Sequence, residues 1–249
     1  KFRRGLMQNS EPSILVIIPA RAGSKGLPGK NVKLLCGQPL IAWPIETAKA
    51  LKLDTTIMVS TDSQEIADIS LQYGAEVPFL RPSPLANDQA KTVDVIMHSL
   101  DWYDEKGKEF DYIILLEPTS PLTETTDIES AFKDLQDNLN QADSIVGVVE
   151  HDSTHPEFSI EKIGRLIKPY NKKEFSDVKR RQEIDNIYFL DGSFYISTLQ
   201  SIRNNQSFYH HRTMSFEMPK CKSFEIDDIV DFFCVESMII NKDIIRGDK

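Results

Sequence analysis

Apolar runs of strand length alternate with stretches of helical spacing from residue 14 to residue 150. The first run, Ile14–Pro19, is continuous and rich in β-branched residues, as in a strand buried on both faces. Further strands are expected at 55–60, 76–80, 112–117 and 144–149, and helices at 39–53, 64–73, 92–106 and 126–138. This order predicts an α/β fold with a mostly parallel sheet and helices on both faces.

The pattern changes after residue 150. Residues 151–190 are polar, carry two basic clusters within 172–181, and show no helical stripe. This region is either a linker or a β-rich excursion from the core that makes a subunit contact. Strand character returns at 187–196, and apolar residues at helical spacing over 227–242 predict a terminal helix packed on the sheet.

Three polar loops follow predicted strands, at 21–31, 60–63 and 117–123. Crossovers between parallel strands are right-handed, so the loops that follow such strands lie at one edge of the sheet. Ligands bind at that edge in open α/β sheets. We therefore expect these loops to converge on one cleft.

The first of these loops is rich in glycine and basic residues. Arg21, Lys25 and Lys30 come directly after a buried strand, in a turn whose backbone N–H groups can form an anion-binding nest. A Walker A loop is disfavoured because five residues, not four, separate Gly23 from Gly29, and Asn31 replaces the hydroxyl that binds magnesium. The pattern favours a polyphosphate site over a plain strand-to-helix turn with solvated charges.

Two proline-rich segments are weaker candidates. Residues 81–92 form a stiff loop with small residues that could border a base, although an exposed connection has the same composition. Residues 116–122 join a strand end to two prolines and two hydroxyls, which would hold Glu117 in a fixed position. The alternative for this second segment is an ordinary turn.

A pair of carboxylates lies near the end of the chain. Glu225 and Asp227 alternate on an extended segment and so point to one face. Two carboxylates with phosphate oxygens and waters suit Mg²⁺. The alternative is an acidic helix N-terminus in which Asp227 or Asp228 is a cap.

Composition excludes several classes of protein. The chain has 249 residues and a net charge of −9, which argues against a nucleic-acid-binding surface. No apolar stretch approaches the roughly 18 residues of a membrane helix. Three cysteines without a C-x-x-C pair fit a reduced, cytoplasmic protein, and the histidines lack zinc-ligand spacing. Residues 1–12 predict a flexible tail before a single domain at 13–249.

Six motifs together resemble one family. They are I-P-A-R-x-x-S-K-G-L-P-x-K-N, S-T-D, R-P-x-x-L-A-x-D-x-A, L-x-P-T-S-P-L, R-R-Q followed by G-x-x-Y-I, and a final I-D. In this order, between Ile14 and Phe232, they resemble the acylneuraminate cytidylyltransferases, which include the CMP-sialic acid synthetases and bacterial relatives for legionaminic and pseudaminic acids. The resemblance is to the diacetyllegionaminic branch in particular.

The resemblance implies a Rossmann-like nucleotidyltransferase core and a cytoplasmic homodimer, with pairing of dimers left open. It implies that an inserted dimerisation arm at 152–188 reaches the partner's active site. In the implied reaction, the anomeric hydroxyl of a nine-carbon 2-keto acid (a nonulosonic acid) attacks the α-phosphorus of CTP. Pyrophosphate leaves, and Mg²⁺ assists, with Mn²⁺ as a substitute.

Site residues carry over by motif position. The resemblance implies catalytic roles for Arg21, Lys25 and Lys30 on the triphosphate. It implies nucleotide contacts by these three and by Ala20, Gly23, Ser24, Asn31, Arg81, Ala90 and Thr92. It implies a sugar site formed by Glu117, Gly192 and Tyr195, with Arg181 and Gln182 from the partner subunit. It implies a metal held by Glu225 and Asp227.

Five positions depart from the family pattern. Glu117 stands where sialic acid enzymes typically carry Gln, and Thr123 where Arg often follows P-T-S-P-L. Phe189 and Asp191 occupy positions that are often Arg and Asn, and Glu225 replaces the usual first Asp of the metal pair. The nucleotide half is intact while the sugar half differs. This difference favours N,N′-diacetyllegionaminic acid as the substrate, followed by N-acetylneuraminic acid.

Two alternatives remain open from the sequence. A cytidylyltransferase for the eight-carbon sugar Kdo shares the chemistry, although the R-R-Q arm and the S-K-G-L-P-x-K-N loop favour the nine-carbon branch. A nucleotide- or sugar-binding module without catalysis is the second, and the replaced Asp at position 225 is its main support.

Overall fold

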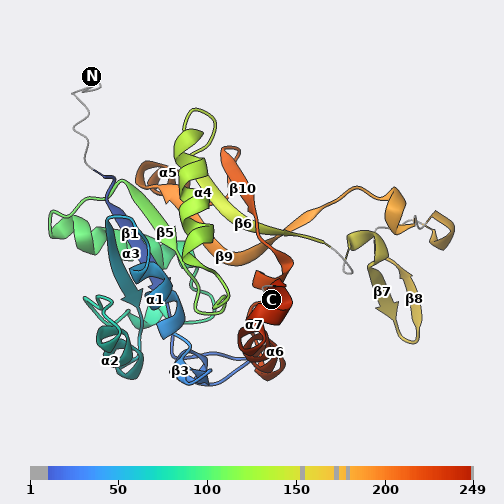
Figure 1. The fold of residues 1–249 in the computed structure, drawn as a ribbon, viewed down its shortest axis with the longest axis horizontal. Coiled ribbons are helices and arrows are strands. Elements are labelled where there is room, and N and C mark those ends of the chain that lie inside the picture. Colours follow the sequence, from blue (N-terminus) through green and yellow to red (C-terminus); the bar gives the residue numbers. More distant parts are fainter. Residues whose placement is uncertain (1–10, 152–154, 171–173, 178–179, 248–249) are drawn as a thin grey trace.

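The computed structural model describes residues 11–151, 155–170, 174–177 and 180–247. Its centre is a six-stranded sheet in the order β10-β6-β9-β5-β1-β4 (Figure 1). The strands are β1 (Ile14–Pro19), β4 (Thr55–Ser60), β5 (Tyr112–Leu115), β6 (Ser144–Glu150), β9 (Tyr188–Thr198) and β10 (Thr213–Glu217). The expected loose tail at 1–12 falls mostly outside the described residues.

The sheet is mostly parallel, as predicted, but it is mixed. β1 pairs in parallel with β4 and β5, and β6 with β10, whereas β9 runs antiparallel to both β5 and β6. Antiparallel β9 brings Gly192 and Tyr195 back toward the edge where β1 and β5 end. This reversal gives the site a wall that parallel strands alone would not provide.

Helices cover both faces. They are α1 (Ala42–Lys49), α2 (Gln64–Gln72), α3 (Thr92–Glu105), α4 (Thr125–Asp137), α5 (Leu199–Asn205), α6 (Ile229–Ile240) and α7 (Lys242–Arg246). Among the described residues, none of these helices has the length and apolar character needed to cross a membrane.

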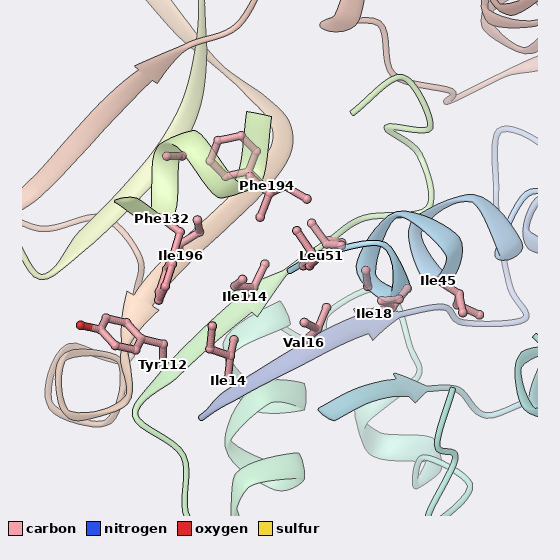
Figure 2. Packing of buried hydrophobic residues seen from close by; sticks show 14 of the residues in the cluster. Ile14, Val16, Ile18, Ile45, Leu51, Tyr112, Ile114, Phe132, Phe194 and Ile196 are labelled. Carbon is pink, nitrogen blue, oxygen red and sulfur yellow. The ribbon is translucent and has the colours of Figure 1, made fainter. Parts of the chain in front are cut away.

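The core is divided by β1. Ile14, Val16 and Ile18 face a cluster formed with α1, α2 and α4 (Figure 2). Leu15 and Ile17 face a second cluster, formed with α3 and α5. All five side chains are at most 1% exposed. Burial of each contributes about 1.5–3 kcal/mol relative to exposure, so β1 is a rigid support for the loop that follows it.

Several predicted boundaries were wrong. The helix expected at 39–53 begins only at Ala42, after the small hairpin of β2 (Leu34–Leu35) and β3 (Gln38–Pro39). The expected strand at 76–80 makes only two isolated bridges, Met58 to Glu76 and Thr61 to Leu80. Pro78 lies between these two bridges and has no N–H to donate to a continuous ladder. α5 and β10 were not predicted, because both are short and half-exposed.

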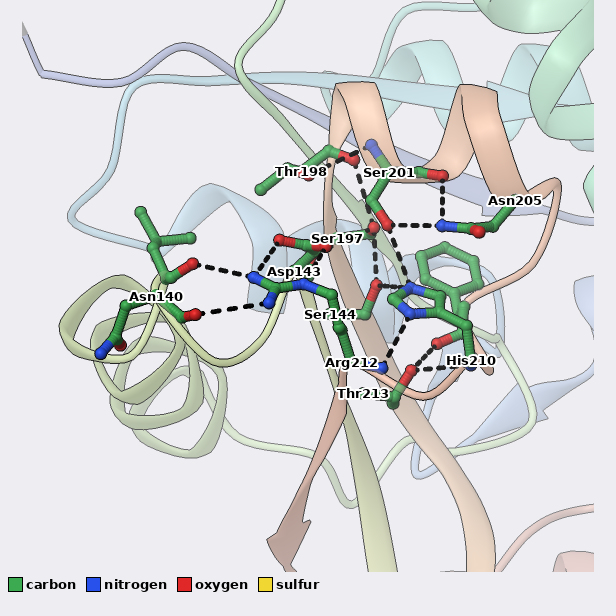
Figure 3. Close-up of polar contacts among 12 residues, drawn as sticks. Asn140, Asp143, Ser144, Ser197, Thr198, Ser201, Asn205, His210, Arg212 and Thr213 are labelled. Carbon is green, nitrogen blue, oxygen red and sulfur yellow. Dashed lines mark hydrogen bonds and ion pairs between the residues drawn. The ribbon is translucent and has the colours of Figure 1, made fainter.

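A polar cluster lies where β6 begins and β9 ends, at the edge of the sheet opposite the carboxyl ends of β1 and β5 (Figure 3). His210 Nε2 lies 3.1 Å from Ser144 Oγ and 3.0 Å from Ser201 Oγ. Arg212 donates two hydrogen bonds to Asp143, at 2.7 and 2.9 Å. These contacts fix the connection between α5 and β10 against the starts of β6 and α5.

In the residues that the structure describes, the region 151–190 is a β-rich excursion and not a simple linker. Its described part contains the antiparallel hairpin of β7 (Ile160–Ile163) and β8 (Leu166–Pro169), which lies far from the sheet (Figure 1). Short 3₁₀ turns flank the hairpin at Pro156–Phe158, Phe175–Asp177 and Arg181–Glu183. We call residues 152–188 the arm.

Candidate active site

A pocket of about 300 Å³ opens where β1 and β5 end. Its walls come from the loop after β1, the loop at 81–92, the first turn of α3 and the loop after β5. The lining residues are Pro19, Arg21, Ser24, Lys30, Asn31, Arg81, Leu85, Asn87, Asp88, Ala90, Thr92, Val95, Glu117, Pro118 and Thr119. Most of the predicted nucleotide residues are therefore brought together here.

The loop at 20–31 is held from behind. Ala20 N–H donates to Ser60 O at 2.9 Å, and Ala22 N–H donates to Asp62 Oδ1 at 2.8 Å. Asn31 Nδ2 donates to Arg21 O at 2.9 Å, which closes the loop on itself. The 60–63 loop thus supports the pocket and does not line it, so the expected convergence of three loops was wrong for this one.

Three predicted residues of this loop, Ala20, Gly23 and Lys25, lie outside the lining. Ala20 is 1% exposed and belongs to the core behind the pocket. Gly23 has no atom within 4 Å of where a Cβ would stand, so its surroundings are open. The open space leaves room for a ligand to approach the Gly23 backbone.

Arg21 and Lys25 share one carboxylate. Arg21 Nη1 lies 2.7 Å from Asp88 Oδ1, and Lys25 Nζ lies 2.6 Å from Asp88 Oδ2. The paired cations lower the pKa of Asp88. Lys25 is outside the lining and its side chain is 80% exposed, so it stands at the mouth of the pocket.

Lys30 is the most buried of the three cations. Its Nζ donates to Ile226 O at 2.7 Å and lies 3.6 Å from Asp227 Oδ1, and its side chain is 12% exposed. A Cβ on Gly26 would stand 2.2 Å from Asp227 O. The basic loop therefore packs directly against the segment that carries the carboxylate pair.

Arg81 is a buried cation in the opposite wall. It is 7% exposed, and its Nε donates to Ser60 Oγ at 3.1 Å while Nη2 donates to Ser60 O. Burial lowers its pKa to about 10, against the opposing effect of Asp62. Held in this way, Arg81 can position a flat ligand beside Ala90 and Thr92.

Carboxylates gather on the other side of Lys30. Burial, together with Glu117, Asp227 and Asp191, raises the pKa of Glu225 to about 7. Burial also raises the pKa of Glu117, with Thr119 and Lys30 acting against the shift. Gly192 has a φ of +65°, and a Cβ there would stand 2.5 Å from Glu225 Oε1. Only glycine leaves room for this carboxylate.

The donor set fits a hard divalent cation. Glu225 and Asp227 supply carboxylate oxygens. Burial and the neighbouring carboxylates raise the pKa of Glu225, and a bound cation would stabilise its ionised form. The described residues contain no cluster of three His, Cys, Asp or Glu that could enclose a metal. Two carboxylates beside the basic loop suit Mg²⁺, which is bound by one or two carboxylates together with substrate phosphates.

The capping alternative is correct for one neighbouring residue. Asp228 caps α6, since its Oδ1 accepts from Val230 N at 2.7 Å and from Asp231 N at 3.0 Å. Glu225 lies before the cap, and its carboxyl is turned toward Gly192.

Tyr195 has a partner that the sequence did not suggest. Its ring lies 6.0 Å from that of Tyr209, with the two rings at 78° to each other. Burial and the nearby Glu117 raise the pKa of Tyr195. Tyr209 lies on an irregular connection without periodicity, and a Phe-Tyr pair before two histidines was its only signal.

Arg181 and Gln182 are not brought to the pocket of their own chain. Both lie in the 3₁₀ turn Arg181–Glu183 of the arm, which extends away from the sheet (Figure 1).

Comparison with known proteins identifies the family. The cytidylyltransferase family matches residues 15–238 of this chain. The chain belongs to this family. It is therefore a nucleotidyltransferase, and the motif resemblance to the acylneuraminate cytidylyltransferases is confirmed by its relatives.

Three relatives show how this cytidylyltransferase is related to named enzymes. It is 38% identical to a CMP-N,N′-diacetyllegionaminic acid synthase of Legionella pneumophila, over 91% of this chain and 96% of that protein. It is 34% identical to the post-translational flagellin modification protein B of Campylobacter coli, over 94% and 98%. It is 33% identical to an Escherichia coli N-acylneuraminate cytidylyltransferase, over 88% and 50%.

Solved structures share the fold of this cytidylyltransferase. A CMP:2-keto-3-deoxy-manno-octonic acid synthetase complexed with CTP has a TM-score of 0.67 at 15% identity and covers 92% of this chain and 99% of its own. A 4-diphosphocytidyl-2C-methyl-D-erythritol synthase of Anaerococcus prevotii has a TM-score of 0.59 at 12% identity, over 92% and 98%. The predicted nucleotidyltransferase fold is confirmed.

Proposed function

We propose that this cytidylyltransferase transfers CMP from CTP to the anomeric hydroxyl of a nonulosonic acid. The hydroxyl oxygen forms a bond to the α-phosphorus, the bond from that phosphorus to the bridging oxygen breaks, and pyrophosphate leaves. The observation that carries the proposal is the pocket lined by Arg21, Lys30, Arg81 and Glu117, with the Glu225 carboxylate outside the lining but close to Lys30 and Glu117. This arrangement provides separate places for a polyphosphate and for a polar sugar.

The cations stabilise charge on the triphosphate. Arg21 and Lys30 line the pocket and Lys25 stands at its mouth, so together they follow a phosphate chain from inside to outside. Preorganised positive charge of this kind stabilises the charge that develops on leaving pyrophosphate. Ser24, Asn31 and the open backbone at Gly23 support the phosphates. Arg81, Ala90 and Thr92 border the nucleoside, and Ala20 is buried behind the pocket.

Glu225 and Asp227 would hold Mg²⁺, with Mn²⁺ as a substitute. When bound, the ion neutralises phosphate charge and orients the α-phosphoryl group. Lys30, which contacts Asp227 and the backbone of Ile226, keeps these carboxylates next to the phosphate loop.

The sugar is N,N′-diacetyllegionaminic acid in our proposal, followed by N-acetylneuraminic acid. Glu117, Gly192 and Tyr195 lie together beside Glu225, where a sugar hydroxyl or an acylamino N–H can bond to Glu117. The 38% identity to a diacetyllegionaminic acid synthase supports this choice. The three cysteines are free thiols, which suits a cytoplasmic enzyme.

A homodimer completes the sugar site in this proposal. The hairpin of the arm exposes Ile163, Leu166 and Ile167, and the arm carries Arg181 and Gln182 away from their own pocket. Exposed apolar residues on such an extension suit burial against a second copy. The arm would bring these two residues to the partner's sugar. This arrangement also allows two dimers to pair into a tetramer.

The test is pyrophosphate release from CTP and Mg²⁺ with N-acetylneuraminate, N,N′-diacetyllegionaminate, pseudaminate and Kdo in parallel. We expect the highest kcat/KM with diacetyllegionaminate. A higher value with N-acetylneuraminate would overturn the choice of sugar but not the reaction. Turnover with Kdo alone would overturn the nonulosonic acid, and CTP binding without turnover on any sugar would overturn the reaction.

A further inference from the structure

The carboxylate pair stands on a segment without regular structure. Between β10 and α6 the chain forms only the 3₁₀ turn Lys220–Lys222 before it reaches Glu225 and Asp227. No sheet hydrogen bonds hold these described residues in register. The place of the carboxylates must therefore depend on individual anchors.

One anchor is at Ile226, between the two carboxylates. Its N–H donates to Thr119 O at 2.8 Å, its carbonyl accepts from Lys30, and its side chain is fully buried against Leu27 and Phe232. The N–H groups of Asp227 and Asp228 also donate to Asp231 Oδ2, at 3.0 and 3.1 Å. Together these contacts form a first anchor on the C-terminal side of Glu225, and a second on its N-terminal side is needed to fix its direction.

The second anchor is Lys222. Its Nζ lies 2.8 and 2.9 Å from the two carboxylate oxygens of Asp127 and 2.8 Å from Glu124 Oε2, and its side chain is 11% exposed. Burial would lower the pKa of Lys222, but the hydrogen bonds to Asp127 and Glu124 raise it. A buried ammonium with three carboxylate oxygens is a rigid attachment, because losing either side leaves an unpaired buried charge.

The attachment point on α4 is itself tied to the site. Glu124 and Asp127 form the capping box at the start of α4, directly after the loop that begins at Glu117. Within that loop, Ser120 Oγ donates to Gly192 O at 3.1 Å and Thr123 Oγ1 donates to Ser193 O at 3.3 Å. Lys222 therefore connects the Glu225 segment to the same rigid body that carries Glu117 and Gly192.

We propose that Lys222 is a positioning residue that fixes Glu225 and Asp227 for metal binding by anchoring their segment to the first turn of α4. The inference rests on the proposed function for the role of the carboxylate pair. It adds a residue that touches neither substrate nor metal and that no motif indicates.

Lys242 provides a matched control. It lies on α7, its Nζ is 2.6 Å from Glu124 Oε1, and its side chain is 50% exposed. Lys242→Met removes the same charge beside the same carboxylate, but it leaves the Glu225 segment attached. The comparison with Lys222→Met separates anchoring from a general change of charge.

The first measurement is hydrogen exchange of the full chain without substrate. In Lys222→Met we expect amides of residues 223–228 to exchange at least tenfold faster, because their second anchor is lost. We expect no change there in Lys242→Met, and recovery in Lys222→Arg. This readout does not depend on the reaction, so it separates failure of the anchor from failure of the proposed function.

The second measurement is metal binding. We expect Lys222→Met to bind Mn²⁺ roughly tenfold or more weakly in the presence of CTP, as for outer residues that orient metal ligands. CTP binding in EDTA should stay within about twofold of the wild type, since the cations of the pocket are untouched. The Mg²⁺ concentration that gives half-maximal turnover should rise by the same factor as the dissociation constant for Mn²⁺.

Three results would overturn the proposal. They are unchanged exchange at 223–228, equal effects of the two methionine variants, and a loss of metal-free CTP binding as large as the loss of Mn²⁺ binding. If Lys222→Met does not fold, Lys222→Met/Asp127→Asn removes the unpaired charge and is measured in the same way. Wild-type protein without metal-dependent turnover would instead refute the proposed function.

Discussion

Carboxylates in the structure already pair with the cations of the pocket. Asp88 holds Arg21 and Lys25 at the mouth, while Lys30 is bonded to the Ile226 backbone and lies near Asp227. Ion pairs between exposed side chains are worth little, about 0–1 kcal/mol. A triphosphate can therefore replace Asp88 as the partner of Arg21 and Lys25 at a small cost in free energy, whereas the buried Lys30 keeps its contacts.

Arg21→Ala and Lys30→Ala should each lower kcat/KM by about 10²-fold or more. Loss of one preorganised charge contact in a catalytic site costs a few kcal/mol in transition-state stabilisation. The measurement is initial-rate pyrophosphate release, with the exposed Lys52→Ala as the control for a lost positive charge. Wild-type rates in either pocket variant would place the phosphate site elsewhere.

Glu117→Gln should shift sugar preference toward N-acetylneuraminate. Burial raises the pKa of Glu117, and Gln is the neutral residue of the same shape. We expect the ratio of kcat/KM for diacetyllegionaminate to that for N-acetylneuraminate to fall about tenfold, the value of one hydrogen bond to a charged group. An unchanged ratio in a competition assay would show that Glu117 does not contact the sugar.

The basic loop at 20–31 packs against the segment that carries Asp227, and we expect this packing to hold the loop in place for nucleotide binding. Gly26 lies so close to Asp227 O that any Cβ must displace one of them. Gly26→Ala should therefore raise the KM for CTP at least tenfold through movement of the loop, with a small change in Tm. A KM within twofold of the wild type would show that the packing has no part in nucleotide binding.

Gly147→Ala is the contrasting variant for that experiment. In the centre of β6 its Cβ would stand 2.1 Å from Ser193 Oγ and 2.4 Å from Asp191 Oδ1. Here the added methyl overpacks the core of the sheet, so we expect loss of stability of about 1–3 kcal/mol. The two alanine variants distinguish loop packing from sheet packing.

The connection between α5 and β10 should respond to pH through His210. Burial lowers the pKa of His210, with Asp143 acting against the shift and His211 and Arg212 adding to it. The unfolded chain then binds the proton better, so the stabilisation from neutral His210 is complete above about pH 6.5 and is lost as the pH falls below it. Urea unfolding between pH 7.5 and 5 should show a smaller decline in His210→Asn, and equal declines would contradict this assignment.

If the arm crosses to a partner, each active site combines Lys30 of one subunit with Arg181 of the other. Mixing and refolding inactive Lys30→Ala with Arg181→Ala should then restore about a quarter of the wild-type rate at low sugar concentration. Half of the dimers are mixed, and each has one intact site. Analytical ultracentrifugation checks that dimers form, and no recovery in dimeric mixtures would place Arg181 in the pocket of its own chain.

The alternation of strands and helices up to residue 150 was predicted because the pattern of apolar residues within each short segment indicates whether it is a buried strand or an amphipathic helix. Ile14–Pro19 is recognisable as a buried strand from its own residues, and the structure has β1 with these bounds. The phosphate loop was also predictable, since its glycines and cations lie within eleven positions, 21–31. β10 and Tyr209 were not, because an edge strand and an irregular connection have no periodic pattern.

Local order along the chain thus predicted the α/β core, the basic loop and the presence of a carboxylate pair. The fold alone decided that β9 runs antiparallel, that Gly192 faces Glu225, and that Lys30 bonds to a residue 196 positions away. It also decided that Lys222 reaches the start of α4. The physical reason is that such contacts depend on the path of the crossovers and on side-chain packing between distant segments, whereas burial and turn chemistry depend on adjacent residues.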